Sequence, residues 1–98
     1  MYLQFATISV PFPHSTPEGQ RVTHSFDSAV ISAGVSLAGF KASYGTGDHH
    51  THTSQVQITD IKLAAHSVSF NIIFVFDDYI GNQEHGSVDV LITALLAS

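Results

Sequence analysis

The apolar residues of this chain alternate with polar residues along most of its length. In the clearest case, residues 68–76, five large apolar side chains fall on one face of an extended strand: Val68, Phe70, Ile72, Phe74 and Phe76. Side chains of a β-strand change face at every residue, whereas those of an α-helix return to the same face about every 3.6 residues. Val, Ile and Phe also favour strands. The pattern therefore predicts an all-β fold.

Six segments show this alternation, and mostly short connections separate them. They are residues 2–10, 21–26, 30–44, 54–64, 68–76 and 87–97. The first ends before Pro11, because proline cannot donate a hydrogen bond to a β-ladder. A chain of 98 residues is the size of one domain. We therefore expect residues 1–98 to form a single-domain antiparallel β-sandwich of about six strands, with a flattened barrel as the alternative.

Two of the expected strands change the face of their apolar residues midway. In residues 30–44 the change falls at Gly39, and in residues 54–64 it falls at Thr59 and Asp60. A β-bulge at each point would return both halves of the strand to one core. One bulge would bring Ile31, Ala33, Val35 and Leu37 into the same core as Phe40, Ala42 and Tyr44, and the other would bring Val56 and Ile58 into the same core as Ile61 and Leu63.

Charged residues are scarce, at 11% of the chain, where globular proteins average about 25%. A monomer covers its surface with charged residues, so their scarcity indicates surface that is hidden against other copies. The expected strands 68–76 and 87–97 also have apolar residues on their second face: Ile73, Val75, Leu91 and Leu95. Another subunit is the simplest cover for such strands. We therefore expect a homo-oligomer.

The charge balance and the N-terminus exclude several classes of function. The chain has three Lys and Arg residues, far apart, against eight Asp and Glu. Nucleic acids and anionic membrane surfaces are bound by clustered cations, so we expect neither as a partner. The N-terminal MYLQFATISV contains too many polar residues for a membrane span and lacks the basic start of a signal peptide. We expect a cytoplasmic or non-classically secreted protein.

The segment GTGDHHTHT, residues 45–53, concentrates Asp48, His49, His50 and His52. In an extended strand His50 and His52 would share a face, so both could ligate one divalent metal ion. A zinc site needs three or four protein ligands, so such a metal would require copies around a threefold axis at a subunit interface, or further loops. The other interpretations are a ligand-binding loop and a polar hairpin turn. No other cofactor is expected.

The segment DDYIGNQEHG, residues 77–86, contains Asp78, Tyr79, Asn82 and His85. Carboxylate and amide side chains beside an exposed tyrosine are typical of saccharide sites, where polar groups bind hydroxyls and the ring packs on the apolar face of the sugar. The order of the acidic residues does not fit an EF-hand. The alternative is a solvated hairpin turn.

Catalytic patterns are missing from the sequence. No serine lies in a G-x-S-x-G motif. The adjacent Asp77 and Asp78 would point to opposite faces of a strand and make a poor acid/base pair. We therefore expect a protein that is not an enzyme.

Three stretches of the chain resemble the H-type lectin domain: HSFDSAVISAGVSLAGFKASY, VQITDIKLAAHSVSFNIIF and GSVDVLITALLAS. The resemblance covers roughly residues 21–98 and implies a six-stranded antiparallel sandwich. It also implies trimers or hexamers that bind N-acetylgalactosamine or galactose near subunit boundaries. The family's Pro-x-Val is replaced by Ser28-Ala29-Val30, and its Trp-Ile-Ala is replaced by Leu91-Ile92-Thr93-Ala94. No sugar-binding residue is therefore carried over.

These observations lead to three hypotheses. The first is a homo-oligomeric, lectin-like protein that binds carbohydrate through Asp48, His49, His50 and His52 and through the second set in residues 77–86. The second is a self-assembling structural subunit of a shell, fibre or virion-like particle, which low charge and two-sided apolar strands would equally suit. The third is a metal-binding protein that uses the His50 and His52 pair.

Overall fold

The computed structural model describes residues 1–13, 16–43, 51–78 and 85–97, except for the side chains at 42–43, 51–54, 76–78 and 85. Within these ranges the backbone forms six β-strands and no helix. The strands are β1 (Tyr2–Phe12), β2 (Thr16–Ser25), β3 (Val30–Ser43), β4 (Thr51–Leu63), β5 (Ser67–Asp78) and β6 (His85–Leu96). The prediction of an all-β fold is confirmed.

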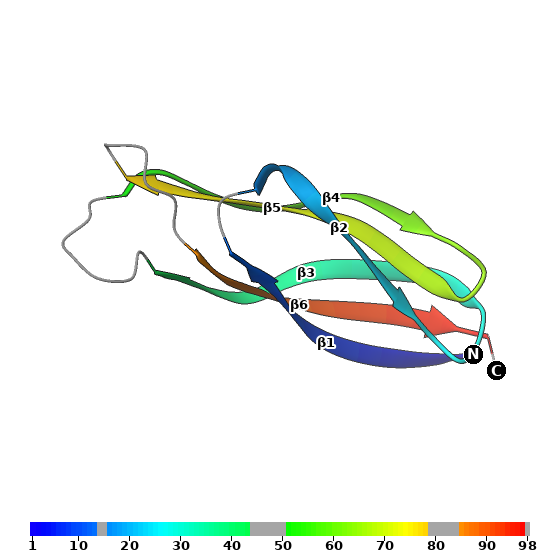
Figure 1. Ribbon diagram of the computed structural model, residues 1–98. Helices are drawn as coiled ribbons and strands as arrows, with labels where there is room; N and C mark the ends of the chain where they lie inside the picture. Colours follow the sequence, from blue (N-terminus) through cyan, green and yellow to red (C-terminus); the bar gives the residue numbers. More distant parts are fainter. Residues whose placement is uncertain (14–15, 44–50, 79–84, 98) are drawn as a thin grey trace.

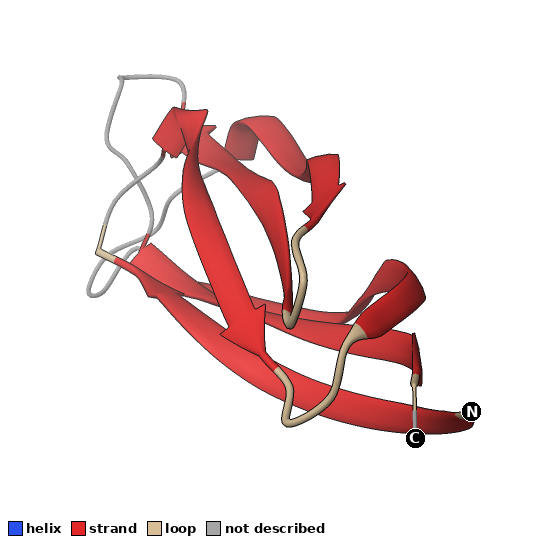
Figure 2. Cartoon of the chain, turned by 90° about the vertical axis from the view of Figure 1, so that its right-hand side faces the viewer, coloured by secondary structure: helices blue, strands red, loops and turns tan. Residues whose placement is uncertain are grey.

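The strands form two three-stranded antiparallel sheets, which lie face to face as a β-sandwich (Figure 1). We call them sheet A, with strand order β1-β6-β3, and sheet B, with strand order β2-β5-β4. Figure 2 looks along the sandwich from the end that holds both termini and shows the two layers with these termini in sheet A. The strands with the most regular apolar alternation, β5 and β6, are the middle strands of their sheets.

The core lies between the two middle strands. Nine of their inward side chains are 0% exposed: Val68, Phe70, Ile72, Phe74, Val88, Val90, Ile92, Ala94 and Leu96. The ring of Phe12 in β1 stacks on that of Phe74, with ring centroids 5.0 Å apart. Burying one large apolar side chain stabilises a fold by about 1.5–3 kcal/mol. The middle strands bury their inward side chains completely, because each middle strand has a strand on both sides and the other sheet packs on its inner face.

Both predicted β-bulges are present. The register of β3 against β6 shifts between Leu37 and Gly39, and that of β4 against β5 shifts between Thr59 and Lys62. Asp60, inside the second shift, has a φ of 55°, in the left-handed region that residues other than glycine seldom adopt. The face change in the sequence thus marks each bulge correctly.

The burial expected around the bulges is confirmed only in part. Ala33, Val35, Val56 and Ile58 are partly buried against the core, but for five further side chains the prediction was wrong. Five large side chains of β3 and β4 are 44–51% exposed: Ile31, Leu37, Phe40, Ile61 and Leu63. β3 and β4 are edge strands, so no further strand covers their outer side. Leu37 and Phe40 pair with inward-facing residues of β6, yet they lie at the margin of sheet A. A further register shift just before Ser32 takes Ile31 out of the inward series.

β2 begins at Thr16 and includes Pro17, whereas the sequence predicted a start at residue 21. Its register against β5 shifts directly after Thr16, so Pro17 falls in an irregular stretch where no ladder donor is needed. Gly19 in this stretch has a φ of 88°, and a Cβ atom there would overlap the side-chain amide of Asn71. That amide donates to the carbonyl oxygen of Glu18 at 3.3 Å. The bulge therefore depends on the glycine.

Candidate functional site

Both segments that the sequence predicts to bind a ligand are flanked by strand ends at one end of the sandwich. Segment 45–53 follows β3 and runs into β4, and segment 77–86 includes the last residues of β5 and the first residues of β6. These four strand ends lie together, opposite the end that holds the two termini (Figure 1). The fold thus brings the strand ends that flank both predicted segments to one end, although the segments are well separated in the sequence. We call this the polar end.

The strands reach further into these segments than predicted. β4 begins at Thr51, β5 ends at Asp78 and β6 begins at His85, each two or three residues beyond the expected strand. His52, Asp78 and His85 are therefore strand residues, which corrects their assignment to loops. The backbone of Thr51 pairs with that of Asp78, and His85 pairs with Ser43. The ladder partners extend the strands through polar sequence that has little strand preference of its own.

The other predicted site residues lie outside the described part of the chain. They are Asp48, His49, His50, Tyr79 and Asn82. Their role in binding stays a prediction that rests on the sequence.

Both layers of the sandwich contribute backbone positions to the polar end. His52 and Asp78 belong to adjacent strands of sheet B, and His85 belongs to the middle strand of sheet A. An imidazole both donates and accepts hydrogen bonds, and a carboxylate accepts them. Residues of these types on the ends of packed strands suit a ligand rich in hydroxyl groups. They are held by the paired backbone of two sheets.

Metal binding through His50 and His52 also stays a prediction. Among the residues that the structure describes, no three His, Cys, Asp or Glu side chains gather closely enough to hold a metal ion. His50 lies outside those residues, and for His52 the structure places only the backbone, in β4.

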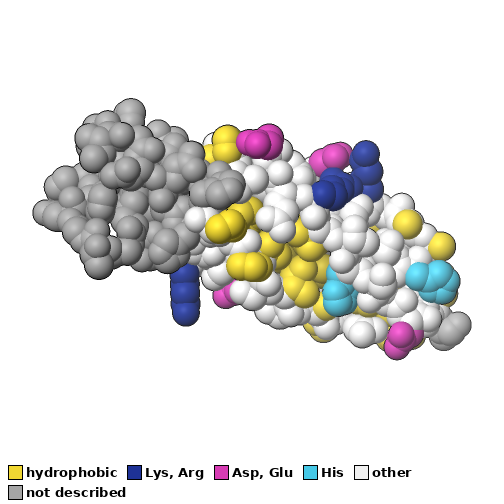
Figure 3. Space-filling model, viewed as in Figure 1, with side chains coloured by type: hydrophobic (Ala, Val, Ile, Leu, Met, Phe, Trp, Pro, Cys, Tyr) yellow, Lys and Arg dark blue, Asp and Glu magenta, His cyan; other side chains and the backbone are white. Residues whose placement is uncertain are grey.

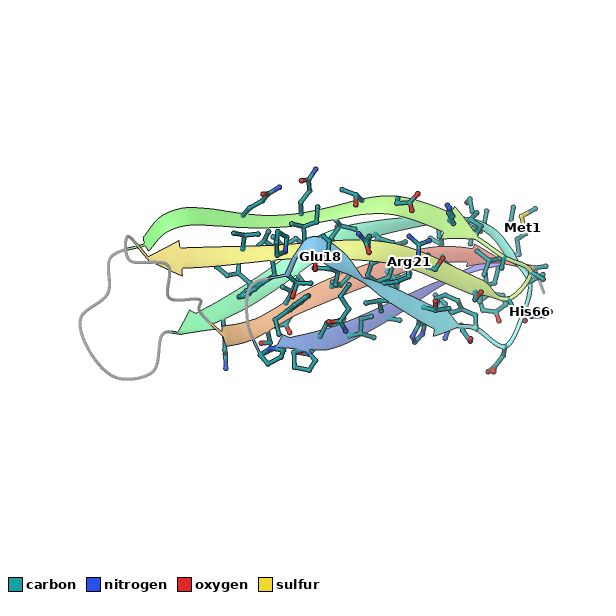
Figure 4. The ribbon with its side chains drawn as sticks, turned by 45° about the horizontal axis from the view of Figure 1, so that its top comes forward. Met1, Glu18, Arg21 and His66 are labelled. Atoms are coloured by element: carbon teal, nitrogen blue, oxygen red, sulfur yellow. The ribbon has the colours of Figure 1, made fainter. Side chains whose placement is uncertain are left out.

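The outer face of sheet B holds a polar cluster that the sequence analysis missed. Arg21 Nη1 donates to the carbonyl oxygen of Asp60 at 2.8 Å and to Asp60 Oδ2 at 3.1 Å, and Nη2 donates to Ser69 Oγ at 2.8 Å. Lys62 Nζ lies 3.9 Å from Asp60 Oδ2. Figure 3 shows Lys and Arg side chains gathered beside an acidic one in this region, and Figure 4 labels Arg21.

The cluster braces the β4 bulge against the other two strands of sheet B. The side chains of Arg21 and Asp60 are 37% and 58% exposed, so their ion pair contributes at most about 1 kcal/mol. Arg21 lies in β2, 39 residues before Asp60, and no sequence pattern connects the two positions. The face change at Asp60 indicated the bulge but not the arginine that holds it.

No protein-family model matches this chain, and neither do any curated proteins or solved structures. The resemblance to H-type lectins therefore rests on the sequence pattern. The described residues include no helix of the length and apolarity needed to cross a membrane.

Proposed function

We propose that this protein is a non-enzymatic, homo-oligomeric carbohydrate-binding protein whose ligand site is the polar end of the sandwich. The observation that supports this proposal is that the strand ends flanking the two predicted segments lie at the same end of the sandwich (Figure 1). Loops and strand ends on a rigid scaffold commonly hold binding residues. Here the scaffold is two packed sheets with a fully buried core.

The residue types fit a sugar better than the other ligands considered. Saccharides are recognised by several convergent hydrogen bonds and by one aromatic ring against an apolar face. Segments 45–53 and 77–86 supply carboxylate, amide and imidazole groups together with Tyr79. Three Lys and Arg in the whole chain favour a neutral ligand over an anionic one. The lectin-like sequence pattern points to galactose or N-acetylgalactosamine as the first sugars to test.

The proposal is tested by calorimetric titration of the full chain with galactose, N-acetylgalactosamine and other common saccharides, with and without calcium. We expect one sugar to bind, and Asp78→Asn or His52→Ala to weaken its affinity about tenfold or more. Asp27→Asn and His66→Ala are matched controls, because Asp27 and His66 are exposed residues on connections at the opposite end. Figure 4 labels His66 there.

Two outcomes would reject the sugar site. One is no binding to any saccharide by titration or on a glycan array. The other is an equal loss of affinity in the polar-end variants and in the Asp27 and His66 controls, which would place the binding elsewhere or nowhere specific.

The second candidate function is a self-assembling structural subunit without a small ligand. The exposed apolar side chains of both sheets favour it, including Leu3, Phe5 and Phe40, which are 51–63% exposed. Light scattering separates the two candidates, because a closed oligomer favours the binding protein and a large open assembly favours the structural subunit. A metal-binding role for the histidines is tested by metal analysis of protein purified without a His tag, in which a stoichiometric metal would support it.

A further inference from the structure

The outer face of sheet A carries four large apolar side chains, among Ser, Thr and Gly residues, in the half that lies nearer the termini. Odd-numbered residues of β1 and β6 point outward, because their even-numbered neighbours belong to the inward series. Leu3 and Phe5 are 60% and 63% exposed, and they lie beside the half-buried Leu91 and Leu95 of β6. We call this the apolar face. Three rows of paired residues make it up: Leu3–Leu95–Ser32, Phe5–Thr93–Gly34 and Thr7–Leu91–Ser36.

The outer face of sheet B differs. The sequence predicted that the second faces of both middle strands would be covered by another subunit, and the structure separates the two cases. Val75 on the outer side of β5 is already 7% exposed within the single chain. Its neighbours in β4 are polar, and Gln55 Nε2 donates to Gln57 Oε1 at 2.8 Å. Ile73, also on the outer side of β5, is half-buried and pairs with Gln57, whereas Leu3 and Phe5 of sheet A are largely exposed. Sheet A is therefore the layer whose outer face leaves large apolar side chains exposed.

Gly34 in the middle row of this face has no explanation within the chain. Its φ is not positive, and a Cβ atom built on it would meet no described atom within 4 Å. Glycine in a strand interior weakens the strand and often marks a place where another backbone or a ligand approaches closely. Ser32 and Ser36 on either side are also small, so the residues of β3 on this face are small where Leu3 and Phe5 of β1 are large.

The apolar face has no ionisable side chain in its three rows, and the nearest on the same side of β6 is Asp89, further toward the polar end. The chain has a net charge of −5, so two copies repel each other wherever acidic residues meet. They can bring this face together without such a contact. A charged partner would find no opposite charge there.

The size of the whole outer face of sheet A, of which the apolar face is the half nearer the termini, argues for a partner as large as a sheet. Three strands about 4.8 Å apart and about 40 Å long present roughly 570 Å² in projection, and more as accessible surface. A standard stable interface buries about 800 Å² on each partner. A second sheet A, stacked along the strands, can approach this area, whereas a short peptide on the apolar half would cover only part of it.

We infer that sheet A packs on sheet A of a second copy, about a twofold axis that runs along β6. Such an axis keeps the strand direction and exchanges the two edges, so β1 of one copy lies over β3 of the other. Phe5 and Gly34 pair with the same residue, Thr93, and are thus at the same height. The axis therefore sets Phe5 of each copy over Gly34 of the other, and Leu3 over Ser32.

An axis perpendicular to the strands does not give this fit. It would place β1 over β1 and β3 over β3, so large side chains would meet large ones and small side chains would meet small ones. The axis along β6 brings Asp89 of the two copies to the same height, beyond the three apolar rows, so the charge of Asp89 does not favour one axis over the other. The self-complementary arrangement is the one with the axis along β6. In it the strands of the two packed sheets cross at about 30°, because each sheet is twisted.

This inference rests on the homo-oligomer in the proposed function and not on its sugar. A twofold contact implies an even number of copies, such as a dimer or a hexamer. Analytical ultracentrifugation of the full chain between about 1 and 100 µM is the first test. An even-numbered oligomer is expected. A monomer throughout, or a trimer, would overturn the inference.

Gly34→Leu tests the contact most directly. The new side chain is added where a Cβ atom meets no described atom of the same chain, and it takes the space that Phe5 of the second copy would occupy. We expect a folded protein by circular dichroism whose dissociation constant rises at least tenfold. Thr23→Leu is its control, since it adds the same side chain to the outer face of sheet B, and it should leave the mass unchanged.

Phe5→Glu is a second variant that tests the same contact if Gly34→Leu does not fold. Phe5 is largely exposed, so its replacement leaves the core intact. It should also dissociate the oligomer, whereas Ile61→Glu on sheet B should not. An unchanged mass in both Gly34→Leu and Phe5→Glu would overturn the inference.

Crosslinking tests the direction of the axis. The chain has no cysteine, so Phe5→Cys and Gly34→Cys chains can be mixed and treated with a short bismaleimide. The mixture should yield more crosslinked dimer than either variant alone. Equal yields would reject the axis along β6. An oligomer of this kind that binds no saccharide would reject the sugar site alone, and a monomer that binds sugar would reject this interface alone.

Discussion

At the scale of single residues, two glycines show how differently the same residue type is used. Gly19 has a φ of 88° and lies against Asn71, so a side chain there is excluded both by backbone conformation and by space. Gly34 has neither constraint within the chain. The first glycine serves the fold of one copy, and the second would be explained by the inferred contact between copies.

Gly19→Ala should therefore destabilise the protein by about 1–3 kcal/mol, since it combines left-handed strain with the overlap on Asn71. Gly34→Ala should be neutral or stabilise the chain by up to about 1 kcal/mol, because alanine restricts the unfolded state and suits a strand better. Urea unfolding at a concentration where the protein is monomeric measures both. Adding Asn71→Ala to Gly19→Ala should recover part of the loss, and no recovery would mean that strain alone is responsible.

At the scale of strands, the sequence predicts the middle of each sheet and fails at the edges. β5 and β6 are covered on both sides, so every inward residue must be apolar and the alternation is unbroken. In β3 and β4 the same residue types occur at edge positions, and Leu37 or Ile61 stays nearly half exposed. The alternation of apolar and polar residues indicates which way a side chain points, but not whether a neighbouring strand covers it.

Strand ends were missed for a related reason. Thr51, Asp78 and His85 continue their strands because an antiparallel partner stands beside each one, and the partner is known only once the strand order is known. The composition of the two polar segments could be recognised from the sequence. The position of their flanking strand ends at one end of the sandwich could not, since it depends on how the two sheets stack.

The bulge in β4 gives a prediction at this scale. Arg21→Ala should lower the free energy of unfolding by less than about 1 kcal/mol, because the arginine and Asp60 are partly exposed and water screens their ion pair. The loss should shrink in high salt. Hydrogen exchange should show faster opening of β4 amides next to Asp60. Lys41→Ala, which removes a cation from β3, is the control. An equal effect in this variant would show that Arg21 does not specifically stabilise the β4 bulge.

At the scale of the whole molecule, the polar end and the apolar face are related by the direction of the strands. The sandwich is 52 Å long, and its polar end is opposite the termini, near which the apolar face lies (Figure 1). A twofold axis along β6 preserves strand direction, so the polar ends of both copies point the same way. A dimer of this kind would present two proposed sugar sites side by side toward one surface.

Valency should therefore depend on the apolar face, whereas the affinity of each site should not. The monomeric Gly34→Leu variant should bind free sugar in solution with the affinity of the unmodified protein, because its substitution lies far from the polar end. On a densely glycosylated surface its apparent affinity should fall by about 10²–10⁴, since two linked sites gain that much from a high effective concentration.

Titration with free sugar and surface plasmon resonance on the glycosylated surface measure the two quantities on the same samples. The Thr23→Leu control should keep both. An equal loss of both affinities in Gly34→Leu would show that the sugar site spans the subunit contact, and equal retention would show that the two polar ends do not act together.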